Sequence, residues 1–269
     1  MWSAFLRNSQ SWSILKRCLT QLSKMVAKTI TFAPIAHIQS CYPDRFGIPR
    51  QAGLVKSAYA DIVFASTEEN KLALRGIEAF SHLWVLFIFH GQTYGSFKPL
   101  VRPPRLGGNK SMGVYATRSP NRPNAIGMSA VELLGIAEKK TELWLQVQGG
   151  DFLDGTPVID IKPYVPYADV IESAQGGWTD GQEPLLPVRW SDEAEAVLSE
   201  SVAPVPEKLR RLINETLEQD PRPGYKRGKD GRKGQRWNMQ VSHYSVYWTV
   251  HNGEAEVVKL EQVEQRPTP

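Results

Sequence analysis

The stretch Glu142-Leu-Trp-Leu-Gln-Val-Gln148 (ELWLQVQ) shows the pattern that decides the fold class of this chain. Leu143, Leu145 and Val147 alternate with tryptophan and glutamine, and a period of two is typical of a strand with one buried face. Four more short segments, rich in β-branched or aromatic residues, are also predicted strands: Thr29–Ile38, Ala60–Phe64, His82–Phe89 and Met128–Ile136.

Glycine and proline clusters separate these predicted strands, at Tyr42–Gly53, Gly91–Gly113 and Gly149–Pro157. Helical patterns are scarce before residue 190. Many short strands joined by long polar loops predict a mainly β fold, built as a barrel or a sandwich. A closed barrel would also remove the exposed strand edges.

The chain after residue 187 has a different pattern. Lys208–Glu218 places its leucines and its isoleucine on one face, which predicts an amphipathic helix. Met239–Val250 alternates like a strand, and Asn252-Gly253 predicts a hairpin turn into Ala255–Leu260. These features predict a small α+β C-terminal domain at 188–269, joined by a linker at 172–187 to a β domain at 25–171.

Residues 1–29 have an unusual composition, with no Asp or Glu, five Lys or Arg and several serines. This composition is typical of an organellar transit peptide. The alternative, which we favour, is a start assigned too early, with Met25 as the true first residue. Residues 1–24 are therefore interpreted as an extension outside the fold.

The overall composition is that of an ordinary globular protein, with 41% hydrophobic residues, 22% charged residues and a net charge of +4. Cys18 and Cys41 lack the spacing of a metal site or a disulfide framework, so we expect neither. No apolar run is long enough to span a bilayer. We therefore expect a cytoplasmic protein that makes no membrane contact.

The most unusual polar segment is GVYATRSPNRPNAIGMS, residues 113–129, which carries Arg118 and Arg122 among prolines and small polar residues. Pro120 and Pro123 disfavour both a helix and a central strand. A rigid loop that presents two arginines remains, and such loops serve binding or catalytic sites more often than cores.

Three other polar segments lie where predicted strands end: Arg45–Gly53, His90–Thr93 and Asp154–Tyr164. The ends of barrel strands gather loops, so these segments are candidates for the same site. Taken one at a time, each also has a purely structural interpretation as rim histidine, turn or surface charge. The chain lacks the common local signatures GxGxxG after a strand, GxxxxGK[ST], HExxH and GxSxG.

A basic segment lies between the predicted helix and the predicted hairpin, flanked by Tyr225 and Trp237. Its charge would provide affinity for phosphates, and the aromatic rings would provide stacking surfaces for unpaired bases. A solvated flexible loop is the alternative interpretation. The candidate nucleic-acid-binding residues are Lys226, Arg227, Lys229, Arg232, Lys233 and Arg236.

Five segments together resemble the TsaA-like family: RFGIPRQ, SHLWVLF, VRPPRLGGN, GVYATRSPNRPNAIGMS and DGTPVIDIKPYVPYA. The resemblance covers about residues 30–170, and PRPGYKRGKDGRKGQRW near the C-terminus is similar to the bacterial members. The characterised members of this family are tRNA methyltransferases that act on adenosine 37, beside the anticodon.

The resemblance implies a compact, closed β-barrel that binds S-adenosyl-L-methionine, and a homodimer with the cofactor pocket near the subunit interface. It implies N6-methylation of N6-threonylcarbamoyladenosine in threonine-type tRNA, with the basic segment gripping the anticodon stem-loop. No metal is implied. Two alternatives stay open: a non-catalytic nucleic-acid-binding barrel, and a small-molecule methyltransferase built on the same barrel.

The resemblance also implies a set of cofactor-binding residues. Arg118 would pair with a carboxylate, either of the cofactor or of the threonyl group, because a guanidinium fork matches a carboxylate. Asp160 and Tyr164 are weak candidates for a catalytic base, by location only. The implied cofactor-binding residues are Pro49, Arg50, Gln51, His90, Gly91, Arg118, Met128, Asp154, Gly155, Thr156 and Pro157.

Overall fold

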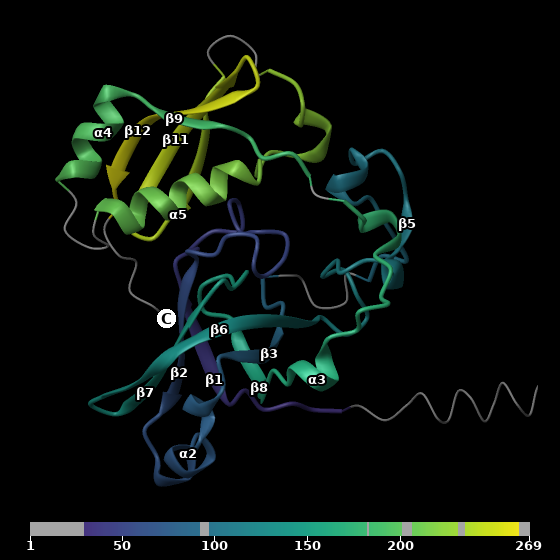
Figure 1. Ribbon diagram of the computed structural model, residues 1–269, viewed down its shortest axis with the longest axis vertical. Coiled ribbons are helices and arrows are strands. Elements are labelled where there is room, and N and C mark those ends of the chain that lie inside the picture. The colour runs from purple at the N-terminus through teal and green to yellow at the C-terminus, as the bar shows by residue number, and fades with distance from the viewer. Residues whose placement is uncertain (1–29, 92–96, 182, 201–205, 231–234, 264–269) are drawn as a thin grey trace, which may run out of the picture. The chain divides into compact units, whose positions relative to one another are not determined.

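The computed structural model describes residues 30–91, 97–181, 183–200, 206–230 and 235–263 (Figure 1). The extension expected at 1–24 lies outside the described residues. The compact unit of the chain begins at Pro34 and contains both of its large sheets.

Six strands of the N-terminal half pair side by side in the order β1-β2-β7-β6-β3-β8 (Figure 1). All neighbouring pairs are antiparallel, and β1 also pairs with β8, so each of the six strands has two partners. The strands are β1 (Ala36–Ser40), β2 (Tyr59–Ala65), β3 (His82–Ile88), β6 (Ile126–Lys139), β7 (Glu142–Gln148) and β8 (Pro157–Pro163).

The alternation seen in the sequence explains how these strands bury one face. Leu143, Leu145 and Val147 of β7 are buried, as are Leu83 and Val85 of β3, and they meet in one hydrophobic core. The predicted mainly β character is confirmed. The predicted strand at Glu142–Gln148 has the bounds of β7, and β2, β3 and β6 lie within about three residues of their predictions.

Two predictions for this sheet were wrong. The first strand was expected at Thr29–Ile38, but β1 begins only at Ala36, because Pro34 precedes it and proline cannot donate to a neighbouring strand. The residues of β8 were expected to belong to the polar segment Asp154–Tyr164, among the loops at the strand ends, and not to form a strand. Pro157 is tolerated as the first strand residue, where it lies opposite His37 at the end of the pairing with β1.

The C-terminal half forms a four-stranded sheet in the order β10-β11-β12-β9, in which only β9 runs parallel to its neighbour. Helices α4 and α5 pack beside it (Figure 1). The elements are β9 (Val188–Trp190), α4 (Asp192–Ser199), α5 (Pro206–Glu218), β10 (Trp237–Val241), β11 (Tyr244–His251) and β12 (Glu254–Gln262).

The predicted amphipathic helix is confirmed as α5, and the Asn252-Gly253 turn is confirmed too. Asn252 and Gly253 have φ values of 51° and 73°, which suit a type I′ hairpin. The single strand expected at Met239–Val250 is wrong, since a turn divides it into β10 and β11. Ser242, with φ of 54°, makes that turn without the glycine that would have marked it.

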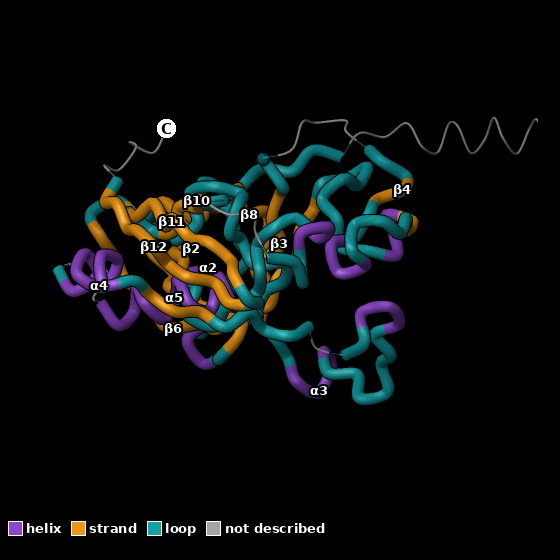
Figure 2. The backbone as a smooth tube through the Cα atoms, turned by 90° about the horizontal axis from the view of Figure 1, so that it is seen from above, coloured by secondary structure: helices purple, strands orange, loops and turns teal. Residues whose placement is uncertain are grey.

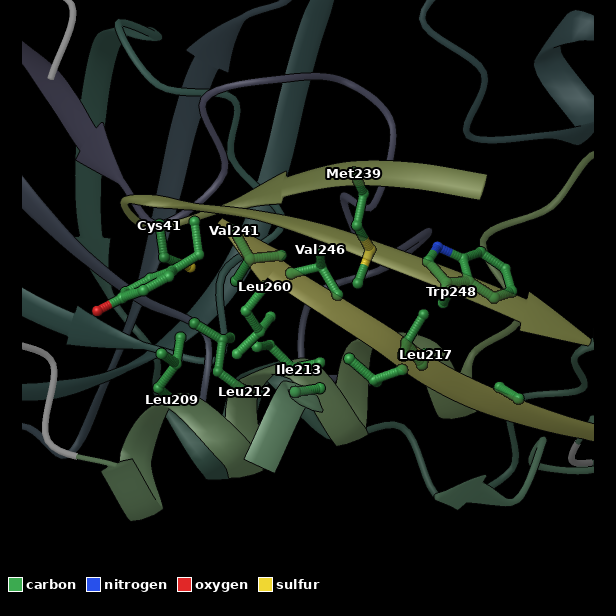
Figure 3. Close-up of a cluster of buried hydrophobic side chains, with 14 of the residues drawn as sticks. Cys41, Leu209, Leu212, Ile213, Leu217, Met239, Val241, Val246, Trp248 and Leu260 are labelled. Carbon is green, nitrogen blue, oxygen red and sulfur yellow. The ribbon is translucent and has the colours of Figure 1, made fainter. Parts of the chain in front are cut away.

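The C-terminal core also contains side chains from the connection between β1 and β2. Cys41 packs with α5 residues such as Leu212 and with Val246 of β11 (Figure 3). Tyr42 belongs to the same cluster. Thr216 donates to the Leu212 carbonyl at 2.7 Å, so the Tyr42 hydroxyl, 3.1 Å away, is the donor to Thr216. Burial raises the pKa of Cys41 to about 12. The C-terminal core is therefore built from both halves of the chain, while the six-stranded sheet has a core of its own.

The long connection between β3 and β6 contains a small two-stranded sheet, β4 (Leu100–Val101) with β5 (Met112–Gly113). Figure 2 shows this loop-rich region in teal around β4, apart from the strands in orange. The remaining short elements are α2 (Glu68–Ala73), η2 (Ile77–Ala79), η3 (Pro104–Leu106), η4 (Val114–Ala116), α3 (Pro166–Asp169), η5 (Gly177–Thr179) and η6 (Gly224–Lys226).

None of the helices in the described ranges is long and apolar enough to cross a membrane. The same ranges contain no cluster of three or more histidine, cysteine or acidic residues that could hold a metal ion.

Candidate functional site

A cavity of about 450 Å³ lies where β3 and β6 meet the polar loops that the sequence singled out. Its volume falls in the range of about 300–1,000 Å³ that is usual for small-molecule sites. Eight of the residues predicted to bind a cofactor line this cavity: Pro49, Arg50, Gln51, His90, Gly91, Arg118, Met128 and Thr156.

The other three predicted residues lie just outside the lining and shape the loop that carries Thr156. The Asp154 carboxylate accepts a hydrogen bond from the Ser40 backbone N–H at 2.8 Å. Gly155 has a φ of +75°, a conformation that favours glycine. Pro157 begins β8. Their contacts fix the backbone rather than reach into the cavity.

The two arginines of the 113–129 loop have different partners. Arg118 donates to the Gln51 side-chain oxygen at 2.6 Å, in the wall of the cavity. Arg122 donates to the Thr117 carbonyl at 2.7 Å and to the Val114 carbonyl at 3.3 Å. Both arginines line the cavity, but the Arg122 guanidinium is bound by carbonyls of its own loop, whereas Arg118 binds a side chain of the cavity wall.

A carboxylate that the sequence analysis missed, Asp151, also lines the cavity. Ser129 of β6 donates to it at 2.5 Å. Burial raises the pKa of Asp151, and the Ser129 hydrogen bond and the charge of Arg118 oppose that rise. The signal available in the sequence was its position, directly after the predicted strand at 142–148 and two glycines.

The apolar wall of the cavity includes Phe87 and Phe89, whose rings meet edge to face at 5.2 Å. The sequence indicated only a buried strand here. Gly127 on β6 makes room for Phe87, because a Cβ at that position would lie 2.3 Å from the ring. The cavity thus combines an aromatic wall with polar groups on one rim.

His90 lies at the end of β3, with Nδ1 3.3 Å from the Thr156 hydroxyl. Partial burial lowers its pKa, and the positive charge of Arg45 acts in the same direction. A pKa below the usual value keeps the imidazole neutral at pH 7. Arg45, which also lines the cavity, was noted in the sequence but not assigned to the cofactor set.

Neither weak candidate for a catalytic base lines this cavity. The Asp160 carboxylate pairs with Lys162 Nζ at 2.7 Å. The Tyr164 ring packs beside Trp84, with 5.5 Å between ring centroids. The structure therefore gives neither side chain a place beside a ligand in the cavity.

Arg50 connects the cavity to the C-terminal half of the chain. It donates to the Asp220 carbonyl at 3.1 Å and pairs with the Glu183 carboxylate at 3.4 Å. Arg227 binds the same Glu183 carboxylate, and it also donates to the Gln219 carbonyl at 2.6 Å. Arg227 was predicted to bind nucleic acid, but these inward contacts occupy its guanidinium.

The rest of the basic segment is divided between surface and core. Trp237 was expected to offer a stacking surface, but its ring packs against Phe46 and Trp248, at centroid distances of 6.1 and 6.0 Å. Tyr225 is 59% exposed and Lys226 lies over its ring. Lys229 and Arg236 are exposed, whereas Arg232 and Lys233 lie outside the described residues.

The two parts of the fold match two protein-family models in the same order. Residues 37–170 match the tRNA-methyltransferase O N-terminal domain, and residues 183–263 match the TrmO C-terminal domain. A fold and a cavity of this kind, joined to that C-terminal domain, define a class of RNA-modifying methyltransferases.

Similar proteins agree with these matches. The tRNA (adenine(37)-N6)-methyltransferase of Escherichia coli K12 is 42% identical over 231 residues, which cover 86% of this chain and 97% of that protein. A Pseudomonas aeruginosa protein with the provisional name S-adenosylmethionine-dependent methyltransferase RcsF is 42% identical over 220 residues, 82% of this chain and 92% of that protein. The crystal structure of TrmO from Pseudomonas aeruginosa aligns with a TM-score of 0.69 at 34% identity, covering 87% of this chain and 99% of that one.

This chain belongs to the tRNA-methyltransferase O family.

Proposed function

We propose that this protein methylates N6 of N6-threonylcarbamoyladenosine at position 37 of threonine-type tRNA. As a member of its family, the chain is an S-adenosyl-L-methionine-dependent tRNA methyltransferase. The observation that carries the proposal is the 450 Å³ cavity, in which Arg118, Asp151 and an aromatic wall lie together at the ends of β3 and β6.

The lining of the cavity fits the three parts of S-adenosylmethionine. We propose that Phe87 and Phe89 pack against its apolar and aromatic portions, as aromatic side chains do in small-molecule sites. Arg118 would bind its carboxylate, and Asp151 would lie near its positively charged groups. When bound, the cofactor supplies an electrophilic methyl group on a sulfonium.

The residues of this chain then contribute mainly placement. Pro120 and Pro123 restrict the 113–129 loop, and Arg122 holds its carbonyls, so little freedom is lost when a ligand binds Arg118. Holding two reactants in line can account for much of the rate of a transfer reaction. The described cavity offers His90, which is neutral at pH 7, as a polar group on its rim.

We further propose that the ring of six strands acts as a closed β-barrel, which the β1–β8 pairing supports. The protein would work as a cytoplasmic homodimer, with the C-terminal half on the anticodon stem-loop. Exposed Lys229 and Arg236, together with half-buried Lys226, support that last proposal, since cations on one segment suit phosphates.

The proposal is tested by methyl transfer from labelled S-adenosylmethionine to threonine tRNA transcripts with and without the threonylcarbamoyl group. We expect transfer only to the threonylcarbamoylated tRNA. Equal transfer to both would contradict the assigned substrate. Transfer to neither, by folded protein that binds the cofactor, would favour a small-molecule methyltransferase. Retention of tRNA without cofactor binding would favour a non-catalytic module.

The assignment of Arg118 is tested by Arg118→Lys, which keeps the charge and loses the planar fork. We expect calorimetric titration to show the Kd for S-adenosylmethionine raised about tenfold or more, because hydrogen bonds to charged groups contribute about 1.5–3 kcal/mol. Arg75→Lys is the matched control, since Arg75 is exposed and lines neither described cavity. An unchanged Kd in Arg118→Lys would exclude the role.

A further inference from the structure

A second cavity, of about 1,310 Å³, adjoins the first. It lies in the loop-rich region around β4 and η3. The hydrogen bond from Arg118 to Gln51 belongs to the wall between the two cavities. The residues that line both are Arg50, Gln51, Thr117, Arg118 and Pro120.

The charged groups of this second cavity favour an anionic ligand. Lys98 and Arg102 line it, are exposed, and have no carboxylate partner within the described part of the chain. Glu183 is the acidic residue of the lining, and Arg50 and Arg227 already bind it. Two free cations therefore face a cavity whose carboxylate is neutralised.

The same cavity presents an aromatic side chain. Tyr115 of η4 is 71% exposed, and the Arg122 guanidinium carbon lies 5.7 Å from the centre of its ring. Trp178 also lines the cavity, and its indole N–H donates to the Ala116 carbonyl at 3.0 Å, which ties the 172–187 segment to η4. The Tyr115 ring is therefore in contact with the Arg122 guanidinium, and it is exposed enough to stack with a planar ligand.

We propose that this second cavity is the acceptor site, which takes the target nucleotide of the tRNA, with its base on Tyr115 and its neighbouring phosphates on Lys98 and Arg102. This inference rests on the proposed function. A base in a single-stranded loop can be turned out and stacked on an aromatic ring without melting a duplex. The shared wall at Arg118 and Gln51 brings such a base beside the cofactor cavity.

The first experiment compares Tyr115→Ala with Tyr115→Phe in steady-state methyl transfer by the full chain. We expect Tyr115→Ala to lower kcat/KM for threonylcarbamoylated tRNA by about tenfold or more, the usual effect of removing one stacking ring. Tyr115→Phe keeps the ring and should retain the activity. The Kd for S-adenosylmethionine should change in neither variant.

Tyr167→Ala is the matched control, because Tyr167 is 93% exposed on α3 and lines neither described cavity. It should leave kcat/KM unchanged. For the phosphates, Lys98→Ala/Arg102→Ala should make the dependence of tRNA affinity on salt less steep, by about 0.7 for each phosphate that the protein no longer neutralises.

The outcomes separate this inference from the proposed function. No methyl transfer by wild-type protein would overturn the proposed function itself. Transfer by wild-type protein with full activity in Tyr115→Ala would overturn the acceptor site alone. A Tyr115→Ala protein that loses activity together with a change of oligomeric state, seen by size-exclusion chromatography, would assign this face to a subunit interface and also overturn the site.

Discussion

In the loop between β5 and β6, one arginine is turned inward and one is directed at the site, whereas in the segment after α5 two arginines are turned inward. Arg122 is held by carbonyls of its own loop, and Arg118 reaches Gln51. After α5, Arg222 is 2% exposed and binds the Asp220 carboxylate through Nε and Nη2, at 2.7 and 2.8 Å. Among the described residues there, Lys229 and Arg236 are exposed cations and Lys226 is half-buried.

The two regions also differ in where the partners of the inward arginines come from. The acceptors of Arg122 lie five and eight residues away in the sequence, so these hydrogen bonds close within the loop itself. Arg222 binds Asp220, two residues away, but Arg227 binds Glu183, which is 44 residues away, so that ion pair forms only when the 172–187 region is in place. The hydrogen bonds of Arg122 therefore close within one loop, whereas the ion pair of Arg227 reaches a distant segment.

The largest effect should come from breaking the buried ion pair between Arg222 and Asp220. Arg222→Met should lower the free energy of unfolding by about 3–5 kcal/mol, because it leaves the Asp220 carboxylate buried without its partner. Urea denaturation monitored by tryptophan fluorescence measures the change. The double variant Asp220→Asn/Arg222→Met should lose less than the sum of the two single variants. Additive losses would show that the two side chains do not act as a pair.

A smaller effect on stability is expected in the loop between β5 and β6, which carries Arg122. Arg122→Ala should lower the free energy of unfolding by about 1–1.5 kcal/mol, through the loss of hydrogen bonds to partly exposed carbonyls. It should also weaken cofactor binding, because Arg118 is then less well positioned. Arg118→Ala is the matched comparison and should weaken binding with no measurable change in urea denaturation. If the two variants behave alike, the division between bracing and binding arginine is wrong.

The smallest effect on stability is expected at the outward cations. Lys226→Ala/Lys229→Ala/Arg236→Ala should leave urea denaturation unchanged and make the salt dependence of tRNA affinity less steep, by about 0.9 for each duplex-stem phosphate that the segment no longer neutralises. Filter binding at several salt concentrations measures this slope. A slope equal to that of wild-type protein would show that the segment does not bind the tRNA.

Much of the fold could be predicted because the strands alternate clearly. Strand β7 and helix α5 each bury one face, and the spacing of their leucines in the sequence shows which face is buried. Elements without such a pattern were missed: β8 is bounded by prolines, and α4 has only eight residues. The turn at Ser242 was missed because its left-handed conformation is carried by serine, a residue that seldom adopts it.

The sequence predicts which loops form the candidate site, but it does not predict where their side chains point. Arg118 and Gln51 were assigned together because the segments that carry them both resemble the TsaA-like family, and both side chains line the cavity. Asp151 belongs to no local motif, and only the pairing of β7 with β6 brings it to Ser129. The internal contacts of Arg227 could not be predicted, because its carboxylate partner Glu183 lies far away in the sequence.

The pairing of β1 with β8 has a consequence for synthesis on the ribosome. Ala36 of β1 lies opposite Val158 of β8, about 120 residues later. A ribosome adds about 5–20 residues per second, so β1 is synthesised roughly 6–24 seconds before the strand that pairs with its second edge. Tyr42, on the same stretch of nascent chain, waits longer still for Thr216. Until then the edge of β1 is open to pairing with other chains, which makes the interval before β8 emerges the period when a chaperone would matter most.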